Sequence, residues 1–229
     1  KALSQGFAPY ILLLNPDTQF INSRIKEVIN YMEENPKIGI IGPKILNSDK
    51  TIQGSARSFP SFSTAFFGRN TILSRLFPNN LLTRKNILNF QGKGDKVLNV
   101  DWVSGACMLI RREALNEIGP LDERFFMYFE DTDLCKRMWI KNWKVVYHPK
   151  FNLLHHVGGS SSQNVYISVF NFHKSIYLYC YKYTNPRLFS IIKFFIIPLL
   201  ITRASIILTI HLFKRMIGNL FRKLVHISP

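Results

Sequence analysis

Residues 134–229 of this sequence contain no acidic side chain. All 14 Asp and Glu residues lie at or before Asp133, and the residues after it include 14 Lys and Arg. The first 133 residues are nearly neutral, with 16 basic and 14 acidic side chains. A near-neutral body followed by a basic, apolar tail predicts an anionic partner for the tail, either lipid headgroups or nucleic acid.

Cysteine is also scarce. Cys107, Cys135 and Cys180 are an odd number without close spacing, so they predict neither a disulfide framework nor a zinc motif and favour a reducing compartment. No signal peptide, internal repeat, Walker loop or Gly-x-Ser-x-Gly elbow is visible. The chain begins with Lys1 and runs almost directly into an apolar strand, which predicts a piece of a longer protein.

Hydrophobic patterning in the first half predicts an α/β sheet. Residues 10–14 are a continuous apolar run typical of a buried strand, residues 25–32 have helical spacing, and residues 38–43 form a second short apolar run. Strand, helix and strand together predict one βαβ unit. Residues 62–88 are apolar with scattered Arg and Asn, which predicts one or two helices in an excursion from the sheet.

The later part of the body has further strand and helix signals. Residues 97–110 have strand character that is interrupted at Ser104, Gly105 and Ala106, where small side chains allow a close approach of ligand or backbone. A short helix is expected after Arg111, ending near Gly119. A strand is expected over residues 144–149.

An acidic cluster lies between these last two elements. Glu130, Asp131 and Asp133 follow an aromatic run and precede apolar residues at helical spacing, so they are expected at the start of a helix. Simple capping is one interpretation, because anions are favoured at a helix N-terminus. Capping needs only one acid, however, and the repulsion among three indicates a bound cation or a proton-transfer role.

Two further candidate sites stand at the ends of expected strands. Asp17 follows the first strand, and His155 and His156 follow the strand that ends the body. Ligands bind α/β sheets at the carboxyl ends of their strands, although a lone His is more often structural. Carboxylates with an imidazole suit Mg²⁺ or Mn²⁺ better than zinc, so the set predicts a metal-bound diphosphate site with a nearby base.

The tail changes character near Val165. Residues 188–213 are dominated by Ile, Leu and Phe, but Lys193, Pro198 and Arg203 interrupt the run, which favours a helix lying in the membrane interface over a clean spanning helix. Packing of these helices on a protein partner is the alternative. We therefore expect a body over residues 1–163 and a basic, membrane-associating helical tail over residues 164–229.

Five segments, in this order and spacing, resemble motifs of the family 2 inverting glycosyltransferases: residues 14–17, 57–60, 104–112, 126–134 and 155–160. The similarity covers roughly residues 1–185 and is greatest to the bacterial rhamnosyltransferase-like group, which builds O-antigen and other cell-wall polysaccharides. It implies an α/β fold of the GT-A type: a Rossmann-like mixed sheet flanked by helices, here without its first βαβ half and with a C-terminal amphipathic, membrane-associated helical segment.

The same resemblance implies roles for the candidate residues. Asp131 stands at the position of the catalytic base, with Glu130 as the close rival. Asp17 stands at the last acid of a DxD-like metal motif whose first acid is replaced by Asn15, and His155, more than His156, stands at a metal-side imidazole. Six residues form the implied binding set for donor and acceptor. Trp102, Ser104 and Gly105 match the segment that walls the donor sugar and acceptor. The others are Asn15, Asp133 and Arg137, and Arg137 is expected to brace the acidic helix.

The implied activity is that of a hexosyltransferase dependent on Mg²⁺ or Mn²⁺. It would invert the anomeric carbon while moving a sugar from a nucleotide-diphosphate donor to a lipid-linked or polysaccharide acceptor. The expected location is the inner face of the plasma membrane, as a peripheral cytoplasmic protein that binds no nucleic acid. Because the missing half carries the nucleotide-reading residues, we expect this chain alone to be inactive or nearly so, with an open sheet edge prone to aggregation.

Two other classes remain as alternatives. The basic, tyrosine-rich tail also suits a nucleic-acid-binding protein, although it is very apolar for a groove that contacts phosphates. A non-catalytic, membrane-bound scaffold with the same fold is favoured by the missing half and disfavoured by the retained acids Asp17, Glu130 and Asp131.

Overall fold

The structure is a computed structural model that describes residues 6–22, 24–60, 87–88, 95–156 and 164–225. It divides into two compact units, the first of Lys1–Asp122 with Glu130–Gly159 and the second of Glu123–Phe129 with Ser160–Pro229. The helical excursion predicted over residues 62–88 falls outside the described residues except for its last two positions, and so does most of the motif over residues 155–160.

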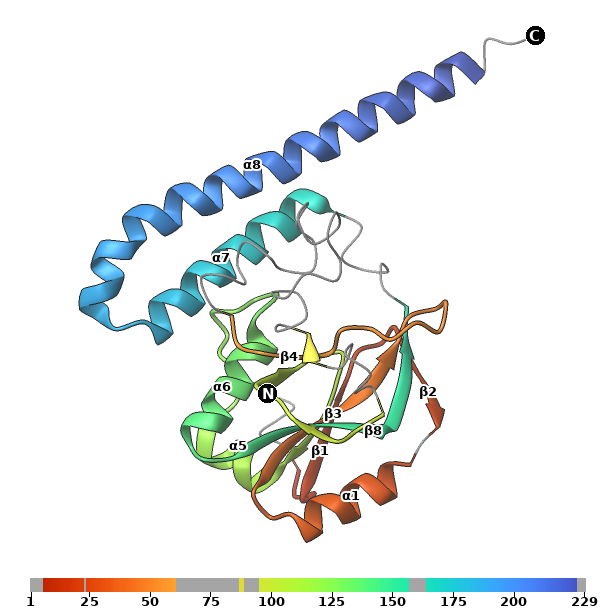
Figure 1. The fold of residues 1–229 in the computed structure, drawn as a ribbon, viewed down its shortest axis with the longest axis vertical. Coiled ribbons are helices and arrows are strands. Elements are labelled where there is room, and N and C mark those ends of the chain that lie inside the picture. The colour runs from red at the N-terminus through yellow and green to blue at the C-terminus, as the bar shows by residue number, and fades with distance from the viewer. Residues whose placement is uncertain (1–5, 23, 61–86, 89–94, 157–163, 226–229) are drawn as a thin grey trace. The chain divides into compact units, whose positions relative to one another are not determined.

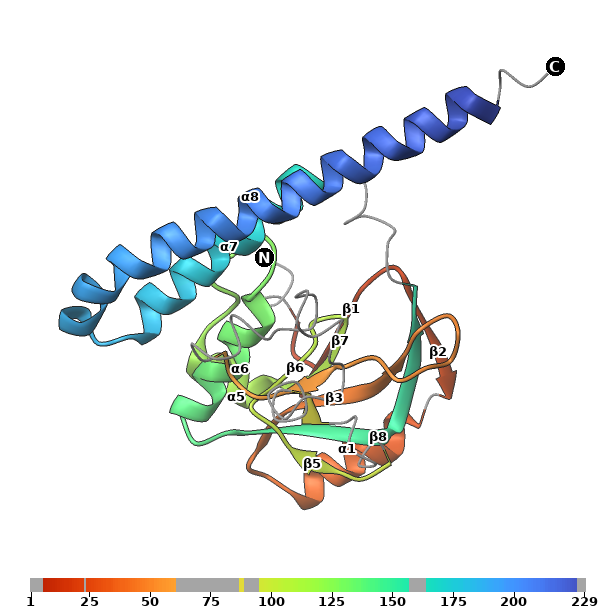
Figure 2. The ribbon, with the colours of Figure 1, turned by 45° about the horizontal axis from the view of Figure 1, so that its top comes forward.

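A mixed sheet is the framework of the first unit (Figure 1). Its strands lie in the order β1 (Tyr10–Leu14), β7 (Cys107–Arg111), β3 (Ile38–Leu46), β8 (Lys144–His155) and β2 (Thr18–Asn22), and β5 (Leu98–Asn99) also pairs with β8. Strands β3 and β8 are parallel, and the other pairs are antiparallel. Figure 2 shows β5 alongside the first part of β8. The predicted mixed α/β sheet is confirmed.

The two strands of the predicted βαβ unit do not pair directly. β1 and β3 run parallel in one sheet and α1 lies between them in the chain, but β7 is inserted between them and is antiparallel to both. Ile110 of β7 pairs with Ile11 on one side and with Ile40 on the other. A strand supplied 60 residues later in the chain cannot be assigned its place from local periodicity, because periodicity carries no information on partners. Within the described sheet, β1 is an edge strand.

Helices cover both faces of this sheet. α1 (Ile25–Glu34) packs on one face through Val28 and Met32, and α5 (Arg112–Ile118) and α6 (Glu130–Ile140) pack on the other. Successive residues of β3 alternate between the two cores, Ile40 facing α5 and α6 and Ile41 facing α1. Burial on both sides explains why β3 reads as a continuous apolar run.

A small two-stranded sheet includes part of the segment 97–110, whose strand character is interrupted at residues 104–106. β4 (Ala56–Arg57) pairs with β6 (Trp102–Val103), as the predicted break at Ser104–Ala106 allows. Gly42 of β3 makes room for β6, since a Cβ on this glycine would lie 2.5 Å from the Cβ of Val103. The turn at residues 104–106 then leads into β7.

The second unit is helical. α7 (Val165–Tyr183) begins at Asn164, whose side chain accepts a hydrogen bond from the N–H of Ile167 at 3.2 Å. α8 (Pro186–Val225) continues through Pro198 without interruption. Among the described residues, Pro186–Gly218 is the one helix long and apolar enough to cross a membrane, by length and composition only.

Candidate active site

The acidic cluster lies at the start of α6, as predicted. Glu130 is the first residue of that helix, and Tyr128 and Phe129 just before it have φ values of +68° and +69°. Two consecutive left-handed residues with side chains cost about 1–2 kcal/mol each, and such strain gathers at functional sites. Within the second unit, the ring of Phe129 packs on Phe172 and Tyr179 of α7, with centroids 5.9 and 5.4 Å away.

Asp131 is held by hydrogen bonds to both carboxylate oxygens. Its Oδ2 accepts from the N–H of Gly105 at 2.9 Å, and its Oδ1 accepts from the N–H and hydroxyl of Thr132 at 2.7 and 3.2 Å. Burial raises the pKa of Asp131, while these hydrogen bonds and the positive charge of Arg57 act against that rise. The result is an oriented carboxylate with a perturbed pKa, as a general base requires.

Glu130 is in a different environment. Burial, and after it the neighbouring charge of Asp131, raises the pKa of Glu130 to about 7. Its Oε2 is buried and accepts no hydrogen bond from the described residues. Glu130 is therefore poised to exchange a proton near neutral pH, and it remains the rival to Asp131 for the role of base.

Asp133 and Arg137 form a buried ion pair within α6. Oδ2 of Asp133, a residue with 0% exposure, accepts from Nε of Arg137 at 2.8 Å. Nη1 of Arg137 also donates to the carbonyls of Ile118 and Gly119 at 2.8 and 3.0 Å, which ties α6 to the end of α5. This geometry fits the predicted bracing role of Arg137 and points the Asp133 carboxylate into the protein. Their predicted contact with donor or acceptor stays a prediction that the geometry does not favour.

Asp17 and His155 come together from neighbouring strands. Asp17 occupies the turn between β1 and β2, and Thr18 directly after it pairs with His155 at the end of β8. The N–H of His156 donates to the carbonyl of Asp17 at 3.0 Å. As a result Oδ1 of Asp17 lies 3.3 Å from Nε2 of His155. The ring of His155 therefore contacts the Asp17 carboxylate, whereas His156 contacts Asp17 through its backbone N–H.

This pair has features of a metal site. Oδ1 of Asp17 is buried and accepts no hydrogen bond from the part of the chain that the structure describes, and the adjacent imidazole nitrogen offers a second ligand atom. Among the residues that the structure describes, no group of three or more His, Cys, Asp or Glu side chains is placed to hold a metal ion. Two protein ligands fit Mg²⁺ or Mn²⁺, which take their other oxygens from waters and substrate phosphates.

The turn at residues 104–106 links the acidic cluster to the Asp17 turn. Gly105 bonds to Asp131, and the carbonyl of Ala106 accepts a 3.0 Å hydrogen bond from the N–H of Asn15. The N–H of Ser104 donates to the carbonyl of Ser55 at 2.9 Å. Hydrogen bonds of their backbone groups therefore place the predicted residues Asn15, Ser104 and Gly105 in one region between Asp17 and Asp131.

Arg57 is a residue of this region to which the sequence assigned no role. Its guanidinium lies 5.1 Å from the ring centroid of Trp102, whose Nε1 donates to the carbonyl of Ser58 at 2.9 Å. The charge of Arg57 also lowers the pKa of Asp131. The motif at residues 57–60 was the available signal, but its connection with Asp131 depends on the pairing of β4 with β6.

The mixed α/β sheet, with a carboxylate pair at one helix start and an Asp–His pair at strand ends, is consistent with the GT-A-like class of fold. The chain belongs to glycosyltransferase family 2. The family described as "Glycosyltransferase like family 2" matches residues 1–168, well over half of the chain. Both the fold class and the resemblance stated from the sequence are confirmed.

Curated relatives carry related names. The chain is 32% identical over 170 residues to N-acetylglucosaminyl-diphospho-decaprenol L-rhamnosyltransferase of Mycobacterium tuberculosis, covering 74% of this chain and 54% of that protein. It is 28% identical over 172 residues to rhamnosyltransferase WbbL of Escherichia coli, covering 74% and 61%. A low-salt glycan biosynthesis hexosyltransferase, Agl10 of Haloferax volcanii, is 28% identical over 127 residues, covering 56% and 36%. The chain thus spans about half the length of the first of these relatives.

Proposed function

We propose that the chain is the catalytic portion of an inverting hexosyltransferase. It would move a sugar, with rhamnose the first candidate, from a nucleotide-diphosphate donor to a lipid-linked or polysaccharide acceptor in the synthesis of cell-wall or O-antigen polysaccharide. The names of the relatives from Mycobacterium tuberculosis and Escherichia coli support this substrate class. The observation that carries the proposal is the oriented Asp131 carboxylate, joined through Gly105 and Ala106 to the turn that holds Asp17.

Asp131 would act as the general base. It takes the proton of the acceptor hydroxyl as that oxygen forms a bond to the anomeric carbon, and the bond from this carbon to the donor phosphate breaks at the same time. The nucleotide diphosphate leaves with the electron pair. A single displacement needs one base and charge compensation at the leaving group, with no covalent nucleophile on the protein.

Asp17 and His155 would hold the divalent cation that family 2 enzymes of this type imply. Bound there, Mg²⁺ or Mn²⁺ supplies positive charge that offsets the charge developing on the departing diphosphate. Asn15, in the same turn, has an amide where a second carboxylate would strengthen the grip. Its backbone instead positions the turn, through the hydrogen bond of its N–H to Ala106.

The tail would bind the membrane that carries the acceptor. Exposed apolar side chains line α8 from Leu188 to Ile217, and Lys214 and Arg215 are exposed near its end. Anionic headgroups on the cytoplasmic face attract such basic residues, and nucleotide sugars are available on the same side. This supports a peripheral protein on the inner face of the plasma membrane, with nucleic acid as the competing partner of the tail.

Sugar transfer from a panel of nucleotide sugars, with Mg²⁺ or Mn²⁺ present, tests the proposal. The 229-residue chain is compared with the longest form that its gene encodes, here called the longer form, and with Asp131→Asn in that form. We expect the longer form to transfer one sugar and Asp131→Asn to lose about 10²–10⁴-fold in rate, with the 229-residue chain inactive or nearly so. If the longer form is silent with every donor yet binds membranes, the scaffold function replaces the enzyme.

A further inference from the structure

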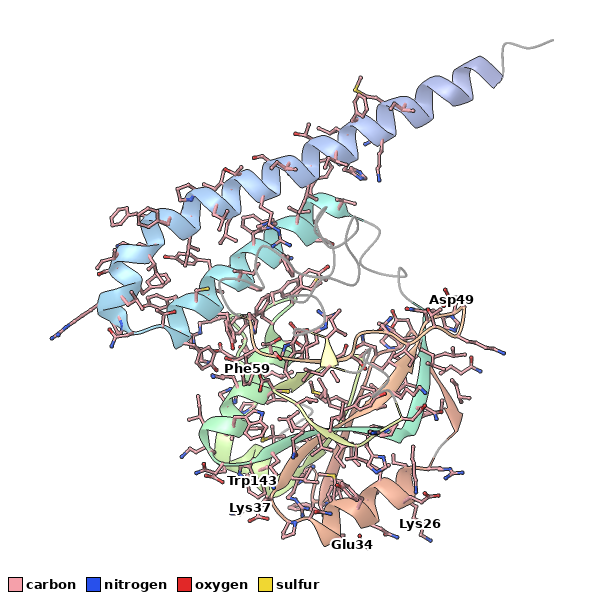
Figure 3. All side chains as sticks on the ribbon, viewed as in Figure 1. Lys26, Glu34, Lys37, Asp49, Phe59 and Trp143 are labelled. Atoms are coloured by element: carbon pink, nitrogen blue, oxygen red, sulfur yellow. The ribbon has the colours of Figure 1, made fainter. Side chains whose placement is uncertain are left out.

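The loop after β3 contacts both histidines at the end of β8. Oε1 of Gln53 lies 3.0 Å from Nδ1 of His155, and the hydroxyl of Ser48 lies 2.9 Å from Nδ1 of His156. The loop is closed by the N–H of Asn47, which donates to the carbonyl of Thr51 at 2.8 Å. Figure 3 labels Asp49 on this loop, at the end of the sheet where β8 also ends. The ring nearest the Asp17 carboxylate is therefore supported from the side opposite to that carboxylate.

In the hydrogen bonds that link Gln53 to Asp49 through Asn47 and Thr51, each donor and acceptor can be assigned. Asp49 can only accept, because hydrogen bonds from Thr51 lower its pKa and keep its carboxylate charged. The Thr51 hydroxyl donates to Oδ1 of Asp49 at 2.5 Å, so its oxygen is left to accept from Nδ2 of Asn47 at 2.9 Å. This fixes which end of the Asn47 amide carries the oxygen.

The same logic continues to the imidazole. Oδ1 of Asn47 accepts from Nε2 of Gln53 at 3.0 Å, so the other end of the Gln53 amide, next to His155, is its carbonyl oxygen. A carbonyl oxygen accepts only, and therefore the hydrogen lies on Nδ1 of His155. Gln53 has only 5% of its surface exposed, so water does not readily replace it in this contact.

We propose that Gln53 is a positioning residue that holds His155 as the Nδ1–H tautomer and so presents the lone pair of Nε2, beside Oδ1 of Asp17, to a divalent cation. Asp49, Thr51 and Asn47 set the orientation of the Gln53 amide. This inference rests on the metal-dependent function proposed above. Ligating histidines commonly donate their second N–H to an oxygen acceptor, and loss of that acceptor typically costs 10–100-fold in metal affinity.

The distance between Nε2 and Oδ1 leaves two arrangements to be distinguished. At 3.3 Å, two atoms that each carry a lone pair repel one another unless a cation or a proton lies between them. With the hydrogen on Nδ1, a neutral ring leaves that space for a cation. The competing arrangement is a ring protonated on both nitrogens, in an ion pair with Asp17.

Two readouts on the same protein test the proposal. Long-range nitrogen–proton NMR of the metal-free, ¹⁵N-labelled chain, well above the ordinary pKa of histidine, reports the tautomer of His155. Electron paramagnetic resonance of free Mn²⁺ reports its affinity. We expect the Nδ1–H tautomer in the parent chain, its loss in Gln53→Leu, and about 10–100-fold weaker Mn²⁺ binding in that variant. Ser48→Ala, which removes the equivalent contact to His156, is the matched control and should change neither.

Three outcomes overturn the proposal and can be told apart. An Nε2–H or doubly protonated His155 in the parent chain removes the assigned tautomer. A Gln53→Leu variant with unchanged tautomer and Mn²⁺ affinity removes the role of Gln53. No Mn²⁺ binding by the parent chain removes the metal role of the Asp17 and His155 pair. None of these three results decides whether the longer form transfers sugar, which is measured separately.

Discussion

The backbone N–H of Gly105 donates a 2.9 Å hydrogen bond to Oδ2 of Asp131. A side chain at Gly105 would crowd Asp131, because a Cβ there would lie 3.2 Å from Cβ and 3.5 Å from Oδ2 of Asp131. One residue therefore both orients the proposed base and lets it come close to the turn that leads into β7. Its amide and its missing side chain make Gly105 a sensitive position for activity.

Gly105→Ala should lower activity more than stability. The added methyl displaces the Asp131 carboxylate by a few tenths of an ångström, and misplacement of a reacting group costs up to about 100-fold. We expect kcat to fall by about 10-fold or more while the Tm changes little. Gly42→Ala is the contrasting variant, because a Cβ there meets Val103 at 2.5 Å and should lower the Tm. An unchanged kcat in Gly105→Ala would contradict the role of Asp131.

Arg57→Met should shift the pH dependence of transfer. The charge of Arg57 lowers the pKa of Asp131, so its removal raises that pKa. Because a base must be deprotonated, the acid limb of kcat/KM should move to higher pH. Arg57→Lys retains a positive charge and should move the limb less. A limb that stays in place in Arg57→Met would indicate that another group, with Glu130 the first candidate, is the base.

Glu130→Gln should stabilise the fold at alkaline pH. In the folded chain the pKa of Glu130 is raised to about 7, so the folded state favours its protonated form. Stability from this group is present below the ordinary pKa of a glutamate and is lost as pH rises through about 7. We expect urea unfolding to show Glu130→Gln as more stable than the parent at about pH 8, by on the order of 1–2 kcal/mol, and similar to it at about pH 4.

The control for that experiment is Glu113→Gln. Glu113 is an exposed acid in the first turn of α5, so its neutralisation removes a charge without relieving a buried one. Glu113→Gln should show the same difference in the free energy of unfolding between the two pH values as the parent chain. A Glu130→Gln variant that behaves like Glu113→Gln would show that Glu130 is solvated in the folded chain.

Asp133→Ala should destabilise the first unit. It leaves the guanidinium of Arg137, whose side chain is only 16% exposed, without its ion-pair partner. Loss of one member of a buried pair costs about 3–5 kcal/mol. Lys141→Ala, which breaks a 3.9 Å surface pair with Glu117, should cost less than about 1 kcal/mol. Normal stability of Asp133→Ala with a raised KM would instead support the substrate-binding role predicted from the sequence.

Removal of residues 186–229 should abolish binding to anionic vesicles. The intact chain is expected to float with vesicles rich in phosphatidylserine at low salt, since each Lys or Arg near the surface contributes about 1 kcal/mol. Replacing exposed Lys214 and Arg215 by Gln should weaken binding to anionic vesicles and leave binding to neutral ones unchanged. Tighter binding to RNA than to vesicles would favour the nucleic-acid alternative.

Much of the fold and the site could be predicted from local sequence. The start of α6 at Glu130, the end of α5 at Gly119 and the break at Ser104–Ala106 all follow from side-chain type and spacing, because caps, turns and amphipathic faces are decided within a few residues. Five motifs in order were enough to identify the family, although none is specific alone. The basic, acid-free tail was evident from composition.

Contacts between distant segments required the tertiary structure. Three such contacts join residues that are 26 to 102 positions apart: the place of β7 between β1 and β3, the hydrogen bond from Gly105 to Asp131, and the support of His155 by Gln53. Asp133 shows the same limit, because composition grouped it with Glu130 and Asp131, whereas only the structure shows that its carboxylate is buried in an ion pair with Arg137. Side-chain type and spacing were enough to nominate candidate site residues and to place the start of most elements. Only the folded chain decided which of them meet, because strand pairing and side-chain burial depend on partners that local periodicity does not specify.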